Sequence, residues 1–211
     1  YIKDGYTVGN PGWQPTKTEL DSYECRHGIG YSRFTSSKNG VKASVLSFVP
    51  LNDNCEISQL TLTNGSSEDK KLSVFSYVEW CLWNADDDMK NFQRNLSTGE
   101  VEVQDSTIYH KTEYRERRNH YAIYSVNTKI DGFDTSRDAF LGAYRGADSP
   151  EAVENGKCTN SMASGWSPIA SHQINVDLAA GETKTFIFVL GYIENPEDEK
   201  WESYGVINKT R

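Results

Sequence analysis

Short runs of residues with a strand-like pattern recur along the whole chain. In each run, apolar and polar positions alternate or β-branched and aromatic side chains gather, and turns rich in Gly or Asn separate the runs. This spacing is typical of an antiparallel β-sandwich and argues against alternating strand and helix units. We therefore predict an all-β fold of two antiparallel sheets, with negligible helix before Pro196. The predicted strands cover residues 41–49, 56–63, 72–80, 107–111, 120–128, 140–144, 173–178 and 184–192.

A change of composition near residue 194 predicts the end of the sandwich. The segment 194–200 is rich in acidic side chains and contains Pro196, and proline is favoured at the first position of a helix. Acidic side chains in the first turn of a helix also interact favourably with its dipole. We predict one sandwich domain over residues 1–193 and an exit segment over residues 194–211, with a helix starting near Pro196.

Composition narrows the class of partner. The chain of 211 residues carries a net charge of -8, which disfavours nucleic acid and anionic membranes. No apolar run reaches the roughly 20 residues that a membrane-spanning helix needs. The chain begins at Tyr1 with neither an initiator Met nor a leader-like segment, so we expect an internal piece of a longer protein. The wide spacing of its cysteines favours a reduced, cytoplasmic protein over one with disulfides. We expect its four cysteines to be reduced and buried; they are Cys25, Cys55, Cys81 and Cys158.

The segment 79–95 holds the densest mixture of aromatic and planar polar side chains. Two tryptophans are followed by an acidic run and then by Arg94 between amide side chains. Sugar sites need flat apolar faces and planar hydrogen-bonding groups, which these residue types supply. Composition alone nevertheless favours a pair of core tryptophans beside a solvated loop. The acidic run 86–88 fits no calcium-loop spacing, and we expect it to be solvated.

Two further segments carry charged or reactive side chains. Residues 110–120 include three arginines that could hold a phosphate, but neighbouring glutamates offset their charge, so we expect a structural or interface role. Residues 25–31 form a predicted compact turn, in which a nucleophilic pair of Cys25 and His27 is conceivable. Nothing in the sequence activates this thiol, so a core or turn role is favoured. The histidines show no zinc-binding spacing, and we predict no metal site.

Several long strings stand in order along the chain: ECRHGIGY at 24–31, FSYVEWCLWNA at 75–85, NFQRN at 91–95 and YHKTEYRERR at 109–118. Together they resemble the cellobiose phosphorylases, which are inverting glycoside phosphorylases of glycoside hydrolase family 94. The resemblance covers nearly the whole chain. It implies an N-terminal supersandwich similar to galactose mutarotase, here without its first strands. A helical linker, an (α/α)6 catalytic barrel and a small β domain would follow.

The resemblance also implies a reaction. Members of this family cleave cellobiose with inorganic phosphate as co-substrate, releasing α-glucose 1-phosphate and glucose, and they need no further cofactor. Because phosphate is itself an anionic nucleophile, the enzyme must supply only an acid for the leaving oxygen. In the family this acid is an Asp of the barrel. We therefore expect no catalytic residue in this chain, no activity from it alone, and a homodimeric full-length enzyme.

Within the resemblance, Gln93 and Arg94 match residues that contact the glucose of the acceptor side, the +1 subsite. We therefore expect Gln93 and Arg94 to bind substrate, which reverses the composition-based interpretation of this loop but not that of the acidic run. The alternative is a stand-alone carbohydrate-binding module with Trp80, Trp83 or Trp166 as its platform. The sequence that follows this chain would separate the two hypotheses.

Overall fold

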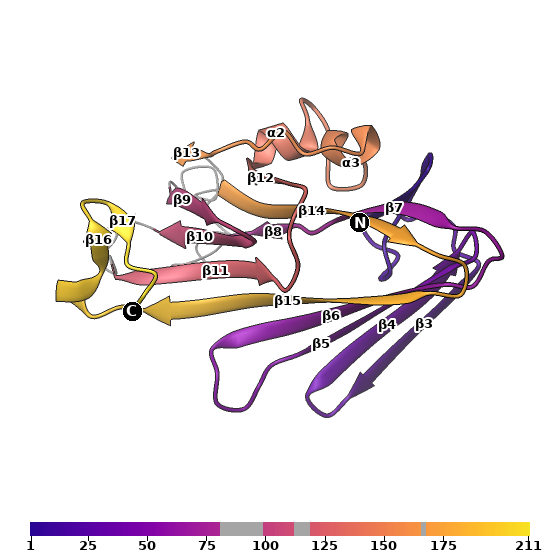
Figure 1. Cartoon of the computed structure of the whole chain (residues 1–211), viewed down its shortest axis with the longest axis horizontal. Coiled ribbons are helices and arrows are strands. Elements are labelled where there is room, and N and C mark those ends of the chain that lie inside the picture. The colour runs from indigo at the N-terminus through magenta and orange to yellow at the C-terminus, as the bar shows by residue number, and fades with distance from the viewer. Residues whose placement is uncertain (81–98, 112–118, 166–167) are drawn as a thin grey trace.

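The computed structural model describes residues 1–80, 99–111, 119–165 and 168–211, apart from the side chain of Ser164. Strands dominate these residues. Two large antiparallel sheets face each other, and two short helices lie on the outer side of the smaller sheet (Figure 1). The two-sheet, all-β fold predicted from the sequence is confirmed.

The larger sheet has nine strands, and every neighbouring pair is antiparallel. Its longest pairing joins β6 to β15 and runs from Thr63 opposite Thr183 to Cys55 opposite Gly191. In sheet order the strands are β13 (Ser164–Gly165), β9 (Gly99–Gln104), β10 (Thr107–Lys111), β11 (His120–Val126), β15 (Thr183–Glu194), β6 (Cys55–Asn64), β5 (Val41–Phe48), β4 (Tyr31–Lys38) and β3 (Ser22–Gly28).

The smaller sheet has six strands and is built around the long strand β14. Its order is β12 (Gly132–Ser136), β14 (Pro168–Leu178), β7 (Lys70–Phe75), β1 (Ile2–Asp4) and β2 (Thr7–Gly9), and β8 (Val78–Glu79) also pairs with β14. The predicted strand 72–80 is thus two strands, β7 and β8, which pair with different parts of β14. The chain therefore continues along β14 from its C-terminal half, which pairs with β7, to its N-terminal end, which pairs with β8.

The core lies between the two sheets and follows the two-residue period of the strands. Leu60 and Leu62 of β6 face Leu72 and Val74 of β7, and all four side chains belong to one buried cluster. Burying such a side chain contributes about 1.5–3 kcal/mol, so this face holds the sheets together. A second cluster packs the helices onto the smaller sheet; it contains Phe75, Phe140, Leu141, Ala152, Val153, Cys158 and Ile169.

The segment 137–155 is helical where the sequence predicts strand or turn. The strand prediction for residues 140–144 is wrong, because α2 (Arg137–Leu141) occupies this position. The Ser136 side chain accepts a hydrogen bond from the Ala139 amide at 3.5 Å and caps the helix, as serine commonly does. A second helix, α3 (Glu151–Asn155), ends at Gly156 in the left-handed conformation.

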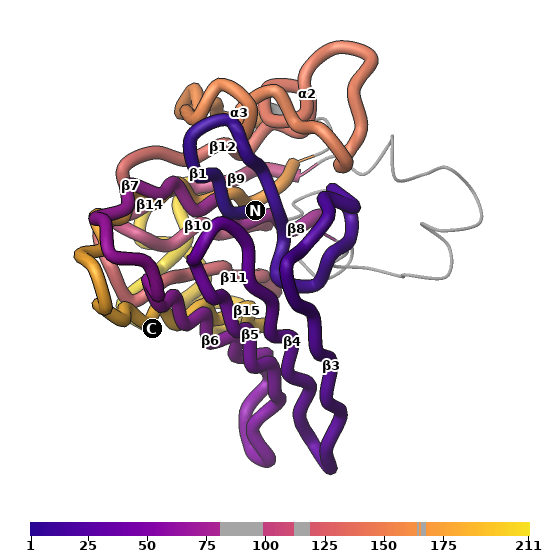
Figure 2. The backbone as a smooth tube through the Cα atoms, turned by 90° about the vertical axis from the view of Figure 1, so that its right-hand side faces the viewer, coloured from indigo at the N-terminus to yellow at the C-terminus, as the bar shows by residue number. Residues whose placement is uncertain are grey.

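The β3–β4 hairpin, residues 22–38, extends past the smaller sheet, and we call it the arm (Figure 2). The compact turn predicted at residues 25–31 is instead the end of β3, a two-residue turn and the start of β4. Gly30 in this turn has a φ of 82°, a conformation that glycine adopts without strain. Every residue of β3 is exposed, so no apolar alternation marks it in the sequence.

The exit segment folds back onto the sandwich. Pro196 precedes a single 3-10 turn, η2 (Glu197–Glu199), and a hairpin of β16 (Trp201–Ser203) and β17 (Val206–Ile207) follows it, where the sequence predicted a longer helix. Glu102 of β9 holds this hairpin, because it accepts hydrogen bonds from the Ile207 amide of β17 at 3.0 Å and from Lys209, just after the hairpin, at 2.5 Å. It also accepts a hydrogen bond from Lys111 of β10 at 2.9 Å. The Lys111 ammonium also lies 5.2 Å from the centre of the Trp201 ring.

Candidate functional site

The two residues expected to bind substrate, Gln93 and Arg94, lie outside the described residues. The same holds for Trp83, the acidic run 86–88, the arginines of 112–118 and Trp166. The structure does describe both ends of the connection 81–98. It leaves the smaller sheet after Trp80, which follows β8, and enters the larger sheet at Gly99, where β9 begins. The side chains around Trp80 and Gly99 are therefore the described surroundings of this connection.

We call this set the loop base, and it contains Tyr77, Glu79, Trp80, Gly99, His110 and Arg137. Its polar half is centred on the Glu79 carboxylate. One oxygen of Glu79 accepts hydrogen bonds from the Tyr77 hydroxyl at 2.6 Å and from Arg137 Nε at 3.1 Å. The Tyr77 ring stacks on Phe140 of α2 with their centres 5.1 Å apart. Helix α2 thus fixes both donors, because Arg137 is its first residue.

The apolar half of the loop base joins the two sheets. The Trp80 indole stacks on the His110 imidazole, with ring centres 5.4 Å apart and an angle of 11° between the planes. His110 is only 2% exposed. Burial lowers the pKa of His110 to about 4, so the ring is neutral at pH 7. One face of Trp80 covers His110, so that face is closed to a sugar ring.

An open cleft of about 380 Å³ lies between the sheets and reaches the loop base at Tyr77. Rings of Tyr77, Phe75, Tyr124 and Phe188 line it together with the hydroxyl of Ser76. Aromatic faces beside hydroxyl groups can pack against a sugar ring and bond to its hydroxyls. The lining of this cleft is therefore suited to binding a sugar ring.

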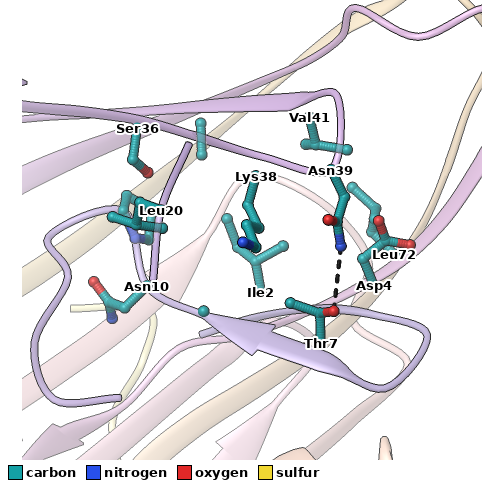
Figure 3. Close-up of a pocket in the computed structure, with 13 residues that line it drawn as sticks. Ile2, Asp4, Thr7, Asn10, Leu20, Ser36, Lys38, Asn39, Val41 and Leu72 are labelled. Carbon is teal, nitrogen blue, oxygen red and sulfur yellow. Dashed lines mark hydrogen bonds between the residues drawn. The ribbon is translucent and has the colours of Figure 1, made fainter. Parts of the chain in front are cut away.

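Two other hollows fit a sugar less well. A cavity of about 40 Å³ lies between the β1–β2 hairpin and the turn from β4 to β5, where Asn39 Nδ2 donates to Thr7 Oγ1 at 3.2 Å (Figure 3). Its volume suits a water molecule or two, whose share of the liquid is about 30 Å³ each. A groove of about 410 Å³ on the outer face of the larger sheet contains Arg26, Arg33 and Lys42, but no aromatic ring lines it among the described residues.

The structure brings together the Cys25 and His27 side chains that the sequence left as a conceivable pair. Cys25 Sγ lies 3.2 Å from His27 Nε2, and His27 Nδ1 lies 2.9 Å from Ser32 Oγ. Both Cys25 and His27 are exposed on the arm. The expectation that all cysteines are buried is therefore wrong for Cys25, and Cys55 is only half-buried. Cys158 is buried, no described cysteine is in a disulfide, and Cys81 lies outside the described residues.

Two features are absent from the described residues. No three or more side chains of His, Cys, Asp or Glu there are grouped so that they could hold a metal ion. Likewise, none of the helices in the described ranges has the length and apolar character needed to cross a bilayer. The loop base brings aromatic, carboxylate and guanidinium groups together, and groups of these kinds line ligand sites.

Comparison with known proteins places this arrangement in a family. The family model described as glycosyl hydrolase 94, supersandwich domain, matches residues 1–206. The chain belongs to the glycosyl hydrolase 94 supersandwich domain family. A solabiose phosphorylase of Paenibacillus borealis is 32% identical over 93% of this chain and 26% of its own length. An N,N'-diacetylchitobiose phosphorylase of Vibrio furnissii is 31% identical over 90% of this chain and 24% of its own length.

A third relative is named differently. The cyclic beta-(1,2)-glucan synthase NdvB of Rhizobium meliloti (strain 1021) is 29% identical over 83% of this chain and 6% of its own length. This supersandwich domain thus spans about a quarter of the two phosphorylases and a much smaller part of the synthase.

Sequence reasoning missed three members of the loop base: Tyr77, His110 and Arg137. His110 was grouped with the charged stretch that follows it. It nevertheless lies two residues after Ile108, on the same buried face of a strand whose bounds were predicted correctly, and the residues between and before them are half-buried. That alternation was the available signal for its burial. The sequence did not reveal the role of Arg137, because its position depends on helix α2, and residues 140–144 were predicted as a strand.

Proposed function

We propose that the full-length protein is an inverting disaccharide phosphorylase that cleaves a β-linked glucoside, and that cellobiose is its substrate. The observation that carries this proposal is the family match over residues 1–206, together with two phosphorylases at 32% and 31% identity. A phosphate oxygen attacks the anomeric carbon and the glycosidic bond breaks. The leaving oxygen takes a proton from an acid, and glucose and α-glucose 1-phosphate result.

The role proposed for this domain is to bind the acceptor sugar. Gln93 and Arg94 would contact the glucose of the +1 subsite, and the acid would come from a catalytic barrel outside this chain. The loop base supports this role, because it fixes both ends of the connection that carries Gln93 and Arg94. Without the barrel, the chain should have no phosphorolytic activity. We also propose a cytoplasmic homodimer, in line with the family resemblance.

A second candidate is a carbohydrate-binding domain without phosphorolysis in the full-length protein. The cleft of about 380 Å³ with its aromatic lining favours this possibility. So does the relative named as a glucan synthase, which shows that the domain occurs in a protein with another activity in its name.

The two candidates are separated by incubating the full-length protein with phosphate and one of four disaccharides. These are cellobiose, solabiose, N,N'-diacetylchitobiose and 3-O-β-D-glucopyranosyl-β-D-glucuronide. We expect α-glucose 1-phosphate from cellobiose, with the highest turnover in the set. If another disaccharide of the set gave more sugar phosphate than cellobiose, the proposed reaction would stand, but cellobiose would be wrong as the substrate. No sugar phosphate from any of them would overturn the proposal. The isolated chain is the control, and turnover by it would overturn the proposed role of the domain.

A further inference from the structure

Strand β3 is a free edge of the larger sheet. It ends the strand order of this sheet in the part of the chain that the structure describes, and all seven of its residues are exposed. The other strands that end the two large sheets are shorter: β12 has five residues, β2 has three and β13 has two. Because the arm extends past the smaller sheet, a second molecule can reach this edge (Figure 2).

An edge of this kind is open to pairing. Every second residue of an edge strand directs its backbone N–H and C=O away from the sheet, and this row of groups is a template for another strand. Proteins commonly protect such edges with a bulge, a proline or a lysine. Strand β3 has the sequence SYECRHG, which contains neither Pro nor Lys, and its pairing with β4 runs without a register shift. Its carboxylate and guanidinium groups, on Glu24 and Arg26, therefore decide which strand can join it.

These two charges stand symmetrically about Cys25, the central residue of β3. If two β3 strands pair antiparallel about a two-fold axis through Cys25, Glu24 of each copy stands directly opposite Arg26 of the other. Opposite charges in this position attract, and the arrangement contains two such pairs. On the other face of the sheet, Tyr23 of each copy stands opposite His27 of the other. The strand is thus complementary to its own antiparallel copy.

Charge also excludes the neighbouring registers. An axis through Glu24 or through Arg26 sets that charge against its own copy, and like charges directly opposite destabilise a strand pair. Only the axis through Cys25 pairs both charges and lets all seven residues of β3 take part. This register also relieves Arg26, which faces Arg33 on β4, because it places a carboxylate on its free side.

We propose that β3 is the pairing edge of a homodimer, in which the β3 strands of two copies join antiparallel about Cys25 and the two larger sheets become one continuous sheet. Each copy uses the same surface, as two-fold symmetry requires. Backbone hydrogen bonds supply affinity, as they do when a peptide adds a strand to a sheet edge, and the two Glu24–Arg26 pairs fix the register. The inference rests on the homodimer named in the proposed function, and it does not depend on phosphorolysis.

The first measurement is sedimentation equilibrium of this chain over a wide range of concentration. We expect the wild type to dimerise reversibly, and Glu24→Arg and Arg26→Glu each to raise the dissociation constant about tenfold or more, because both charge pairs become repulsive. The double variant, Glu24→Arg with Arg26→Glu, regains both attractive pairs and should return the constant to within about threefold of the wild type. A wild-type chain that is monomeric at its highest soluble concentration would overturn the interface.

The chain offers a matched control far from the arm in sequence. Glu199 and Arg211 form an ion pair of 2.7 Å with side chains 53% and 55% exposed, and Glu24 and Arg26 form one of 2.7 Å with side chains 54% and 68% exposed. Glu199→Arg changes the net charge by as much as Glu24→Arg does, and it should leave the dissociation constant near the wild-type value. Equal effects of Glu199→Arg and Glu24→Arg would show that net charge governs association, and would overturn the interface.

The second measurement mixes the two single variants. In the mixture, the two cations of the Glu24→Arg strand face the two carboxylates of the Arg26→Glu strand, so a heterodimer should form at concentrations at which each variant alone is monomeric. Misfolding of either variant cannot produce this gain. Absence of a heterodimer, while the wild type dimerises, would overturn the pairing of these charges and with it the proposed register.

The third measurement tests the position of the axis. Residues directly opposite in an antiparallel pair have Cα atoms about 4.5–5.5 Å apart, so the two copies of Cys25 lie within reach of a short bis-maleimide, which adds one thiol to each of its rings. We expect cross-linked dimer from the wild type and a large loss of it in Cys25→Ser. Equal cross-linking of both would overturn the axis through Cys25. None of the three measurements needs a substrate, so failure of the interface is told apart from failure of the proposed reaction.

Discussion

His110 and His27 lie in the same sheet, each beside an aromatic ring, but in very different surroundings. His110 is 2% exposed and stacks on Trp80, and neither of its nitrogens has a hydrogen-bond partner among the described residues. His27 is exposed on the arm, meets Phe34 edge-on at 6.1 Å, and has one nitrogen near Cys25 and the other near Ser32. The residue that covers His110, Trp80, directly follows β8 of the smaller sheet, whereas the arm extends past that sheet (Figure 2).

The difference shows how the facing sheet decides what a histidine can do in this fold. Removal of water from His110 disfavours its charged form and lowers its pKa to about 4, which leaves a neutral ring fixed by contact. His27 keeps contact with water and with hydrogen-bonding side chains, so no packing constraint fixes it. The loop base is therefore a closed contact between the two sheets, and the arm is suited to meeting solvent or another surface.

Acid should reveal the largest consequence of this difference. The unfolded chain binds a proton at each histidine below about pH 6.5, whereas folded His110 and His172 have pKa values of about 4 because of burial. The contribution of these two histidines to the free energy of unfolding is thus fully present above pH 6.5, falls as the pH drops towards 4, and changes little below that. Each of the two groups should cost roughly 3 kcal/mol over this window. Urea unfolding at pH 7, 6, 5 and 4 measures the loss.

Two variants sharpen the acid experiment. In His110→Leu the fall in stability between pH 6.5 and 5 should be about half that of the wild type, because only His172 still contributes. His27→Ala should follow the wild-type curve. A His110→Leu curve parallel to that of the wild type would show that the buried imidazole does not govern the acid response.

The next largest effect is the difference in unfolding free energy at pH 7 between the alanine variants of the two histidines. His110→Ala removes a ring from a closed contact with Trp80 and should cost about 2–3 kcal/mol of unfolding free energy. His27→Ala removes a side chain that is exposed to water and should change stability by less than about 0.5 kcal/mol. Urea titrations of both variants test this, and equal losses would remove the contrast between the loop base and the arm.

Two arginines give the smallest contrast. Arg137 pairs with Glu79 at 3.1 Å, and the side chains are 39% and 26% exposed, so Arg137→Ala should cost about 0.5–1 kcal/mol. Arg33 stands directly opposite Arg26 on the neighbouring strand, and like charges in this arrangement repel. Arg33→Ala should therefore be neutral or stabilising by a few tenths of a kcal/mol. Thermal melts at low and high salt distinguish these effects, and a loss in Arg33→Ala as large as in Arg137→Ala would contradict them.

The same contrast between covered and uncovered strands limits what the sequence can predict of the fold. Strand β10 was predicted with its observed bounds, because one face is buried and its side chains alternate. Strands β3 and β4 were missed, because no facing sheet imposes that alternation on β3. The aromatic run at residues 140–144 predicted a strand, but the Ser136 cap and the burial of Phe140 and Leu141 made it a helix.

The candidate site was predictable only in part. Gln93 and Arg94 came from the family resemblance, since residue types and spacing alone favoured a solvated loop. The sequence singled out Trp80, but not the partner that covers it, because contacts between the two sheets join segments 30 or more residues apart and leave no local pattern. The ion pair of Glu79 with Arg137, 58 residues further on, is hidden in the same way.

The claim that this domain binds the acceptor sugar is tested most directly by Arg94→Ala in the full-length enzyme. A charge-assisted hydrogen bond to a sugar hydroxyl contributes about 1.5–3 kcal/mol, or one to two powers of ten in affinity. With both substrates varied in the synthetic direction, the KM for glucose should rise, or the rate with glucose fall, by that factor. The KM for α-glucose 1-phosphate should change little, and Gln93→Ala should act in the same direction but more weakly. Unchanged glucose kinetics in Arg94→Ala, or equal damage to both substrates together with a lower melting temperature, would contradict the claim.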